Sequence, residues 1–322
     1  MESLNLDVKD RRILLALDMD ARKPESYIAR KVRLSKQLTN YRIKRLEKNR
    51  IIQSYYPVID HTKIGNKLYR IALKLENITK DKEEEIIKYL KNHASWITSV
   101  LGPWDVWMTL YVKDEYEFMN FWSKFYDKFG FYIKSRWISL ITKFWNFERS
   151  FIYPEKRDRQ KMFILGEKPE INKLDRIDKK VLEELNLNSR QTTLDIATKI
   201  KQTERVVRYR IKKLEIQKII LGYRTFLNTN ALSLKYYKLF IQLKDIKSGD
   251  IERIRTFIRL NPNVIYSTEA LGGYDFELET HFHDSQDLMK FILDIKEKFP
   301  TNIKDVRHME YIKEFKIGYY PF

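Results

Sequence analysis

The sequence predicts an α+β fold in which one arrangement occurs twice: a three-helix unit with a short strand, then a β-α-β-β-α-β sandwich. Three observations support this prediction. The heptapeptide 41–47 (YRIKRLE) returns at 209–215 (YRIKKLE) with six of seven residues identical. The surrounding segments align without a gap at a constant shift of 168 residues, as far as Ile246 against Ile78. Beyond that point, strand and helix periodicities follow in the same order in both copies.

The composition is that of a globular chain large enough for several domains. Of 322 residues, 43% are hydrophobic and 14% aromatic, which excludes a disordered protein. No apolar run is long enough to cross a bilayer and the first residues resemble no export signal, so we expect no membrane partner. The absence of cysteine excludes disulfides, thiolate nucleophiles and zinc–thiolate sites, and it agrees with a cytoplasmic protein.

The net charge of +18 is concentrated in two segments. Residues 1–57 contain 14 Lys and Arg against 7 Asp and Glu, and residues 170–226 contain 14 against 8. These segments therefore carry +13 of the +18, and they are the segments that contain the repeated heptapeptide. Such a concentration of positive charge indicates a surface that binds a polyanion.

Three helices are predicted in the first basic segment. The first covers Leu6 to Leu17, where Asp7 and Asp10 suit the positive end of a helix dipole. Pro24 opens the second helix, which continues to about Val32. Ser35 caps the third helix, which continues to about Lys48, as Thr203 caps its counterpart in the second copy.

The third helix has one apolar face and one basic face. Thr39, Ile43 and Leu46 recur at helical spacing and form the predicted buried stripe. The opposite face presents cations, an amide and a hydroxyl, which contact phosphates and base edges in DNA. A short helix, a turn and a basic helix are typical of a helix-turn-helix unit, and residues 51–56 would form a strand pair or wing packed against it.

Alternating and helical patterns then predict the sandwich of the first copy. The expected strands and helices, in order, are Lys67–Leu75, Lys82–Asn92, Ile97–Leu101, Val106–Val112, Glu115–Lys128 and a last strand from Ile133. In the second copy the turn at Gly272-Gly273-Tyr274-Asp275 matches Gly102-Pro103-Trp104-Asp105 two residues later than the constant shift predicts.

Several short motifs together resemble the Lrp/AsnC (feast/famine) family of transcription regulators. They are Leu-Asp-x-x-Asp from Leu6, Asp20-x-Arg22, Ile28-Ala29, a third helix opened by Ser35 and ending Arg-Ile-x-x-Leu-Glu, and Ile51-Ile52. The resemblance implies a winged helix-turn-helix followed by a ferredoxin-like sandwich, and it covers nearly the whole chain. The family has one module per chain and dimerises, whereas this chain has two.

The predicted division has five parts: 1–57, a winged helix-turn-helix; 58–153, a ferredoxin-like domain; 154–173, an extended linker; 174–226, a second winged helix-turn-helix; and 227–322, a second ferredoxin-like domain. We expect the two sandwiches to pair their sheets within the chain as a pseudo-dimer, with further homo-oligomerisation as in the family. The predicted partner is double-stranded DNA, and no cofactor is expected.

Two groups of residues are predicted to contact DNA. Phosphates are assigned to Arg42, Lys44, Arg45, Arg210, Lys212 and Lys213. Bases are assigned to Gln37, Asn40 and Tyr41, with Lys36 beside them, and to Arg205, Arg208 and Tyr209. We call the third helix of each copy its reading helix. Because Asn favours adenine and Arg favours guanine, the two reading helices predict an asymmetric target site.

In the family, the Gly-x-Tyr-Asp turn lies near the subunit interface and helps to hold small effectors, often amino acids. The corresponding candidates for an effector site here are Gly102, Trp104, Asp105, Gly272, Tyr274 and Asp275. The residues themselves favour a simpler interpretation, a tight strand-to-strand turn that needs glycine for its backbone.

The chain departs from the family pattern at two turns. The family usually has glycine before the Ile-Ile pair, where this chain has Arg50 and Lys218. A turn with positive φ would be strained there, unless its geometry differs, and the extra cations could reach phosphate. In the buried stripe Thr39 stands where the second copy has the usual valine, Val207.

Other functions were weighed against DNA binding. Siroheme decarboxylases share this architecture, but their His-Tyr-x-Arg run is not recognisable here, so we expect no enzyme. An adaptor that recruits the transcription machinery and touches DNA nonspecifically is a further alternative. His281 and His283 share one strand face, yet with no cysteine and no third ligand in view we expect no metal site.

Overall fold

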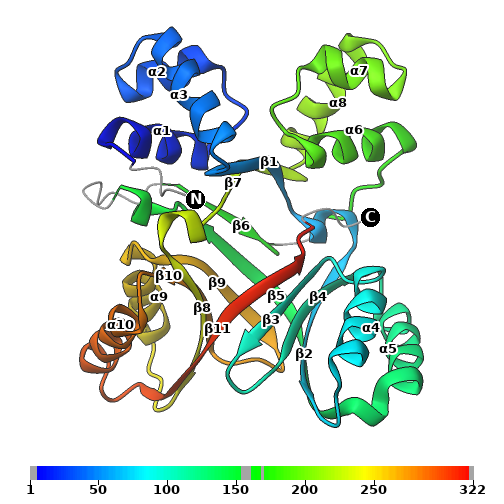
Figure 1. The fold of residues 1–322 in the computed structure, drawn as a ribbon, viewed down its shortest axis with the longest axis vertical. Coiled ribbons are helices and arrows are strands. Elements are labelled where there is room, and N and C mark those ends of the chain that lie inside the picture. The colour runs from blue at the N-terminus through cyan, green and yellow to red at the C-terminus, as the bar shows by residue number, and fades with distance from the viewer. Residues whose placement is uncertain (1–5, 154–160, 168–169, 319–322) are drawn as a thin grey trace.

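The computed structural model describes residues 6–153, 161–167 and 170–318. Two three-helix units lie side by side at one end of the molecule, and the strands of both sandwiches lie at the other end (Figure 1). Within the described residues, no helix combines the length and the apolar character that crossing a membrane requires. The α+β fold predicted from the sequence, with its duplicated order of elements, is confirmed.

The first copy follows the predicted order closely. Its elements are α1 (Val8–Asp18), α2 (Glu25–Val32), α3 (Lys36–Lys48), β1 (Ile52–Ile59), η1 (His61–Ile64), β2 (Lys67–Leu75), α4 (Lys80–Lys91), β3 (Trp96–Leu101), β4 (Val106–Val112), α5 (Glu115–Phe129), η2 (Gly130–Tyr132), β5 (Ile133–Phe147) and η3 (Ser150–Ile152). Side chains cap α1, α3, α4 and α5, each accepting a backbone N–H of the first turn.

The second copy repeats this order after one additional strand. Its elements are β6 (Met162–Leu165), α6 (Arg176–Leu187), α7 (Thr193–Ile200), α8 (Glu204–Ile216), β7 (Ile220–Leu227), η4 (Asn230–Leu232), β8 (Lys235–Leu243), α9 (Asp250–Leu260), β9 (Val264–Leu271), β10 (Phe276–Phe282), α10 (Ser285–Lys298) and β11 (Ile303–Lys316). α6 and α7 begin with capping boxes at Asp175 and Thr192.

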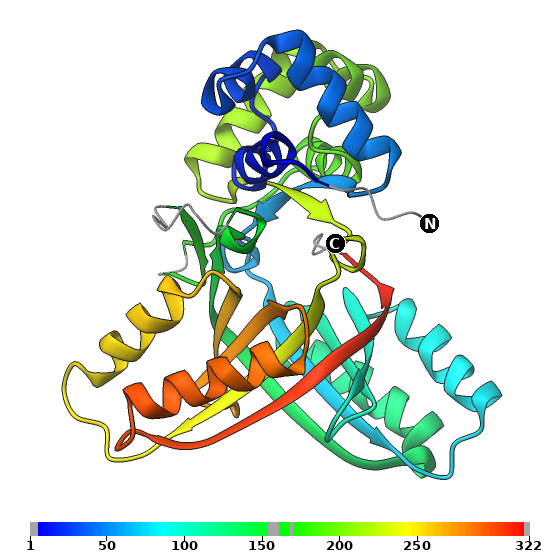
Figure 2. The ribbon, with the colours of Figure 1, turned by 60° about the vertical axis from the view of Figure 1, so that its left-hand side comes forward.

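The strands of the two sandwiches form one closed ring. The order β5-β2-β4-β3 in the first copy and β11-β8-β10-β9 in the second is that of a ferredoxin-like sheet. β3 pairs with β11 and β9 pairs with β5, so eight strands close on one another as a barrel. Closure removes the free strand edges, and α4, α5, α9 and α10 lie outside the strands (Figure 2).

The strands predicted as wings pair with each other. β1 and β7 form a two-stranded antiparallel ribbon, with Tyr55 opposite Thr225, below the helical units. Each strand was expected to pack against its own three-helix unit as a strand pair or wing. The partner is instead the other copy, because each copy supplies only one strand at this place.

The two helical units also share a hydrophobic core. A single cluster of buried residues contains Leu14 of α1 and Leu182 of α6. Reciprocal hydrogen bonds join their loops, since Arg22 Nη1 donates to Gln191 O at 2.8 Å and Arg190 Nη1 donates to Ala21 O at 2.6 Å. The relative position of the two units is therefore fixed by packing as well as by chain connection.

The segment predicted as an extended linker, 154–173, is structured where the structure describes it. β6 pairs with the last part of β5, with Phe144 opposite Leu165. Farther on, the Asn172 N–H donates to Lys63 O at 2.7 Å. The physical reason is the apolar run Met162–Leu165, which can cover the exposed part of β5. Residues 154–160 and 168–169 of the predicted linker lie outside the described residues.

Three distant parts of the chain meet at one buried carboxylate. Asp18 of α1 is fully buried between Arg149, which follows β5, and Arg224 of β7. Nη1 of Arg149 lies 2.6 Å and Nη2 of Arg224 2.7 Å from Asp18 carboxylate oxygens. Desolvation alone would raise the pKa of Asp18, but the charges of Arg224 and Arg149 outweigh it and lower the pKa below its usual value.

We predict that Asp18→Asn lowers the free energy of unfolding by about 3 to 5 kcal/mol at pH 7, because it leaves buried guanidinium groups without their carboxylate. A carboxyl whose pKa falls on folding stabilises the protein above its unfolded-state pKa, and this stabilisation is lost as the pH drops through the folded-state pKa. Urea unfolding at pH 7 measures the change. The control Glu297→Gln, on the exposed face of α10, should stay within about 0.5 kcal/mol of the parent, and equal losses in both variants would contradict this role.

Candidate nucleic-acid interface

The turn between α2 and α3 is built by local hydrogen bonds. Arg33 adopts a left-handed conformation (φ 58°), and the N–H of Leu34 donates to Ala29 O at 3.0 Å. Ser35 then caps α3 by accepting the N–H of Leu38. A left-handed residue at the end of one helix and a hydroxyl cap at the next produce the predicted helix-turn-helix.

α3 and α8 each bury the predicted stripe and expose the opposite face. Thr39, Ile43 and Leu46 are the buried residues of α3, as Val207, Ile211 and Leu214 are of α8. Thr39 fits this apolar stripe because its hydroxyl donates to Ser35 O at 2.8 Å. On the outer faces Tyr41 and Tyr209 are each 64% exposed.

Two of the predicted phosphate contacts of α3 are engaged within the protein. Arg42 Nη1 lies 2.8 Å from an oxygen of Asp7 and 2.9 Å from one of Asp10, and Arg45 Nη2 lies 2.5 Å from Asp10. Asp10 is fully buried, so these arginines compensate a carboxylate that would otherwise be costly to bury. They hold α3 against the start of α1.

The second copy repeats this arrangement. Arg210 Nη1 lies 2.6 Å from Asp175 and 3.1 Å from Asp178, and Lys213 Nζ lies 2.9 Å from Asp178. Of the six residues assigned to phosphates, these two and the two arginines of α3 are therefore committed to intramolecular pairs. Among the six, only Lys44 and Lys212 are exposed and form no ion pair with the described part of the chain.

The last residue of the repeated heptapeptide also has a structural partner. The Tyr55 hydroxyl donates to Glu47 at 2.6 Å, and the Tyr223 hydroxyl donates to Glu215 at 2.7 Å. These bonds join each reading helix to the ribbon strand that follows it. Sequence reasoning missed these roles, although the Leu-Asp-x-x-Asp motif and the tyrosine four residues after the first Ile of Ile-Ile, both present in each copy, were visible as their signal.

The outer faces of the two reading helices differ in charge and hydrogen-bonding groups. α3 presents Lys36 and Gln37 as exposed residues, with the Asn40 amide half-buried. α8 presents Arg205 and Arg208 as exposed residues, and Arg208 Nη2 lies 2.6 Å from Glu204. The structure therefore exposes Gln37, Tyr41, Arg205, Arg208 and Tyr209 and leaves Asn40 half-buried, and base contact by these residues stays a prediction.

Basic residues also occupy strained turn positions beside these helices. Arg50 (φ 54°) and Lys218 (φ 55°), which follow α3 and α8, and Lys201 (φ 55°), which follows α7, are left-handed and exposed, like Arg33. The turn therefore has the left-handed geometry that glycine would suit. Arg50 and Lys218, which stand where the family usually has glycine, adopt this geometry at the cost of backbone strain, and the turn itself is not different. A cation in each place is consistent with contacts to a nearby polyanion.

The turns proposed as an effector site have structural partners. Asp105 accepts the N–H of Leu75 at 2.8 Å, and Asp275 accepts the N–H of Leu243 at 2.7 Å. Trp104 and Tyr274 pack against a buried cluster in the barrel, and Gly102 and Gly272 have positive φ. These contacts support the strand-to-strand turn, and effector binding at the turns stays a prediction.

The predicted histidine pair does not converge on a metal site. His281 is buried in β10, whereas His283 follows the strand and its Nδ1 lies 3.1 Å from Ser233 O. Among the residues that the structure describes, no three His, Asp or Glu side chains form a group that could hold a metal ion.

Family models match both copies of the helix-turn-helix. Residues 6–53 match the model for winged helix-turn-helix DNA-binding domains, and residues 174–215 match the AsnC-type helix-turn-helix domain. With the exposed reading helices described above, these matches define a DNA-binding protein that carries two winged helix-turn-helix modules.

Curated relatives are transcription regulators of about half this length. An HTH-type transcriptional regulator of Pyrococcus furiosus is 30% identical over 152 residues, which are 45% of this chain and 99% of the relative. The leucine-responsive regulatory protein of Haemophilus influenzae is 27% identical over 151 residues, 47% of this chain and 90% of the relative. The chain belongs to the Lrp/AsnC family of DNA-binding transcription regulators, as the resemblance of its motifs implied.

A solved structure matches nearly the whole chain. The crystal structure of the siroheme decarboxylase NirDL covers 96% of this chain and 93% of its own, with a TM-score of 0.64 and 14% identity. At this identity the likeness shows the tandem fold alone. Two modules in one assembly of this kind are therefore a known architecture, and chemistry does not follow from it.

We predict that replacing Arg50 and Lys218 by glycine stabilises the protein while it weakens DNA binding. Each non-glycine residue in the left-handed region costs about 1 to 2 kcal/mol, against about 0.5 to 1 kcal/mol of additional unfolded-state entropy for glycine. The free energy of unfolding should rise by roughly 0.5 to 1 kcal/mol per site, measured by urea unfolding.

Lys48→Gly is the matched control for these substitutions. It removes a cation from the last turn of α3, where the backbone is helical, and should cost about 1 kcal/mol. If Arg50→Gly and Lys218→Gly also destabilise the protein, the strain ascribed to these turns is absent.

Proposed function

We propose that this chain is a sequence-specific regulator that inserts α3 and α8 into one DNA duplex as an intrachain pseudo-dimer. The observation that carries the proposal is the placement of both reading helices at one end of the molecule, held by the β1–β7 ribbon and a shared core. A covalently joined pair meets the second half-site as an intramolecular event, so the fixed geometry replaces dimerisation. Half-sites about 34 Å apart, or a multiple of this, suit two helices on one face of the duplex.

The electrostatic part of the proposal rests on exposed cations. Lys44 and Lys212 occupy equivalent positions on the two helices, and the exposed turn residues Arg33, Arg50, Lys201 and Lys218 lie before and after these helices in the chain. These side chains would neutralise phosphates and release condensed counterions, which makes the affinity depend on salt. Arg42, Arg45, Arg210 and Lys213 instead orient the helices through their aspartates.

Specificity is assigned to the residues that differ between the helices. Gln37, Asn40 and Tyr41 would contact one half-site, and Arg205, Arg208 and Tyr209 the other. Asn40 favours adenine and the arginines favour guanine, so the two half-sites should differ in sequence. The division into domains at 1–57, 58–153, 174–226 and 227–322 belongs to the same proposal, with Met162–Leu165 added to the sheet in place of an extended linker. Further oligomerisation and modulation by a small effector belong to it as well.

We predict that Lys44→Ala with Lys212→Ala weakens binding to all duplexes and flattens its salt dependence. The slope of log K against log salt should decrease in magnitude by about 0.9 for each lost phosphate contact, hence by about 2 in the double variant. Fluorescence anisotropy with labelled duplexes at several salt concentrations measures this slope.

The matched control is Lys134→Ala with Lys304→Ala. These lysines are exposed at equivalent positions on β5 and β11 of the barrel, away from the helical units. The control removes the same charge and should leave the slope within error of the parent. An equal change in both double variants would assign the effect to net charge and overturn the proposed interface.

We predict that selection from random duplexes recovers an asymmetric motif. Transplanting the first reading surface onto the second, by Glu204→Lys, Arg205→Gln and Arg208→Asn, should convert the motif into two inverted copies of one half-site. The reciprocal transplant, Lys36→Glu, Gln37→Arg and Asn40→Arg, should give inverted copies of the other. Sequencing of the selected pools checks both, and the proposal of base reading fails if the parent selects no motif or if neither transplant alters it.

A further inference from the structure

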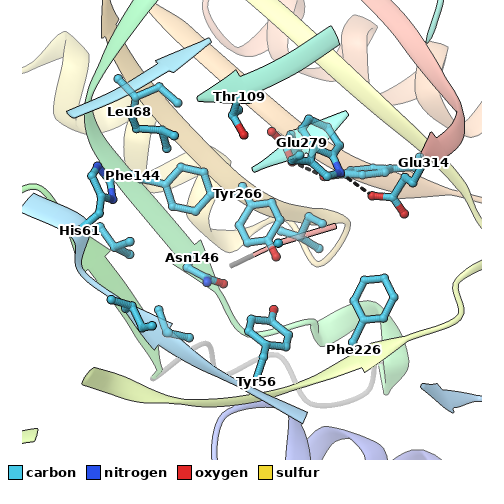
Figure 3. A pocket seen from close by; sticks show the side chains of 18 of the residues that line it. Tyr56, His61, Leu68, Thr109, Phe144, Asn146, Phe226, Tyr266, Glu279 and Glu314 are labelled. Carbon is cyan, nitrogen blue, oxygen red and sulfur yellow. Dashed lines mark hydrogen bonds between the residues drawn. The ribbon is translucent and has the colours of Figure 1, made fainter. Parts of the chain in front are cut away.

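A cavity lies between the β1–β7 ribbon and the mouth of the barrel (Figure 3). Its volume is about 1220 Å³, including its opening to solvent. Aromatic rings from four strands form much of its wall: Tyr56 of β1, Phe144 of β5, Phe226 of β7 and Tyr266 of β9. Pockets that bind small molecules have such apolar walls with a few well-placed polar groups.

Buried polar atoms without partners converge on this cavity. Both ring nitrogens of His61, Oδ1 of Asn146 and Nδ1 of His281 lack a hydrogen-bond partner in the described chain. These three residues are only 2%, 5% and 3% exposed, and all line the cavity. The Asn146 amide points into the open space (Figure 3). Because buried polar groups in native proteins are nearly always satisfied, the cavity is suited to a ligand that supplies the missing bonds.

The unpartnered groups call mainly for hydrogen-bond donors. Burial lowers the pKa of His61 to about 4, and burial together with Arg149 lowers the pKa of His281 to about 3. Both rings are therefore neutral at pH 7, and each neutral imidazole offers one acceptor nitrogen. Asn146 Oδ1 is an acceptor as well, so N–H groups complement this wall better than carbonyl or carboxylate groups do.

Among the lining residues, the carboxylates come from the second copy alone, whereas the first copy supplies Arg70 and Arg149, and Arg149 pairs with Asp18. At the 170-residue shift that applies to β4 and β10, Glu277, Glu279 and His281 stand where the first copy has Trp107, Thr109 and Tyr111. The deepest carboxylates are compensated: Arg70 pairs with Glu277, and Lys238 Nζ lies 3.1 Å from Glu277 and 3.4 Å from Glu279.

Glu314 is exposed at the mouth of the cavity, and its carboxylate forms no ion pair within the described chain. Within the described chain its hydrogen-bond donor is the indole of Trp96, whose Nε1 lies 2.7 Å away. Desolvation raises the pKa of Glu314, and the charge of Glu279 acts in the same direction. The rings of Trp96 and Tyr236 line the cavity beside it, each packed against Tyr311. A carboxylate among aromatic rings favours an ammonium group through ion pairing and cation–π attraction.

We propose that this cavity binds a small aliphatic amine cation. One ammonium group pairs with Glu314 beside Trp96 and Tyr236, and further N–H groups of the same ligand donate to Asn146 and the neutral histidines. An aliphatic chain between nitrogens suits the aromatic walls. The site is distinct from the Gly-x-Trp/Tyr-Asp turns, and because its two halves differ, the chain has one such site in its barrel mouth.

The cavity is placed to communicate with the reading helices. Tyr56 to Ile59 of β1 and Phe226 and Leu227 of β7 line it, and the neighbouring residues Tyr55 and Tyr223 bond to α3 and α8. A ligand that favours one ribbon geometry would change DNA affinity, and DNA would change amine affinity by the same factor. This coupling rests on the proposed function, whereas amine binding does not.

Isothermal titration calorimetry of the DNA-free protein with 1,4-diaminobutane tests the site. We expect saturable binding at one site per chain, with 1,4-butanediol and succinate at least tenfold weaker, because they lack the ammonium group. Equal heats for the diol, or no saturable binding of the diamine, would overturn the proposal.

Glu314→Gln should raise the dissociation constant of the diamine by about tenfold to a hundredfold, the effect of losing a charge-assisted bond. Glu310→Gln is the matched control, since Glu310 lies on the same strand, pairs with Lys235 and does not line the cavity. A thermal melt of each variant verifies folding. If both variants weaken binding equally, nonspecific attraction explains it and the site is refuted.

The regulatory step is measured separately. DNA affinity is compared with and without the diamine, in the parent and in Glu314→Gln, because amines also shield DNA phosphates in both. We expect an effect of at least threefold that only the parent shows. Loss of sequence-specific DNA binding with amine binding intact would refute the proposed function but not the cavity, and identical diamine effects in both proteins would refute the coupling.

Discussion

The carboxylate of Asp18 is the interaction on which the arrangement of the two copies depends. It joins the first helical unit to the end of β5 through Arg149 and to the second copy through Arg224, all in the buried interior. The counterpart of Asp18 at the 168-residue shift is Asn186, and that of Arg224 is Tyr56. These ion pairs therefore occur only once in the molecule. In a two-fold symmetric pair of identical chains, each of the charges would be present twice.

Several basic residues of the helical units hold the reading helices in position and are engaged in ion pairs within the protein. In each copy of the heptapeptide two basic residues pair with aspartates, and the glutamate accepts a hydrogen bond from a tyrosine hydroxyl. These contacts hold the helix on its module. This leaves the tyrosine and the central lysine to face outward. Duplication has preserved the orienting residues and varied the residues near the start of each helix, so a common scaffold supports two different reading surfaces.

Periodicity was sufficient to predict most of the fold. The buried stripe of α3 and the cap at Ser35 depend on local spacing, which the sequence contains in full. The pairing of β1 with β7 joins two segments 168 residues apart, and the residue pattern of neither strand predicts which strand it pairs with. The ion pair between Arg42 and Asp10 could not be predicted from the position of Arg42 on the flank of a helical wheel, because the wheel omits the neighbouring helix.

Fusion of the copies has a consequence inside the barrel as well as on DNA. A dimer of identical chains would present each lining residue twice, so a carboxylate such as Glu279 would face its own copy across the axis. In this chain the first copy supplies Thr109 at that position, and the carboxylates gather on one side of the cavity. An asymmetric charge distribution can orient a small molecule with two different ends, whereas a symmetric one cannot. The same covalent link that allows unequal half-sites on the duplex thus allows an unequal interior.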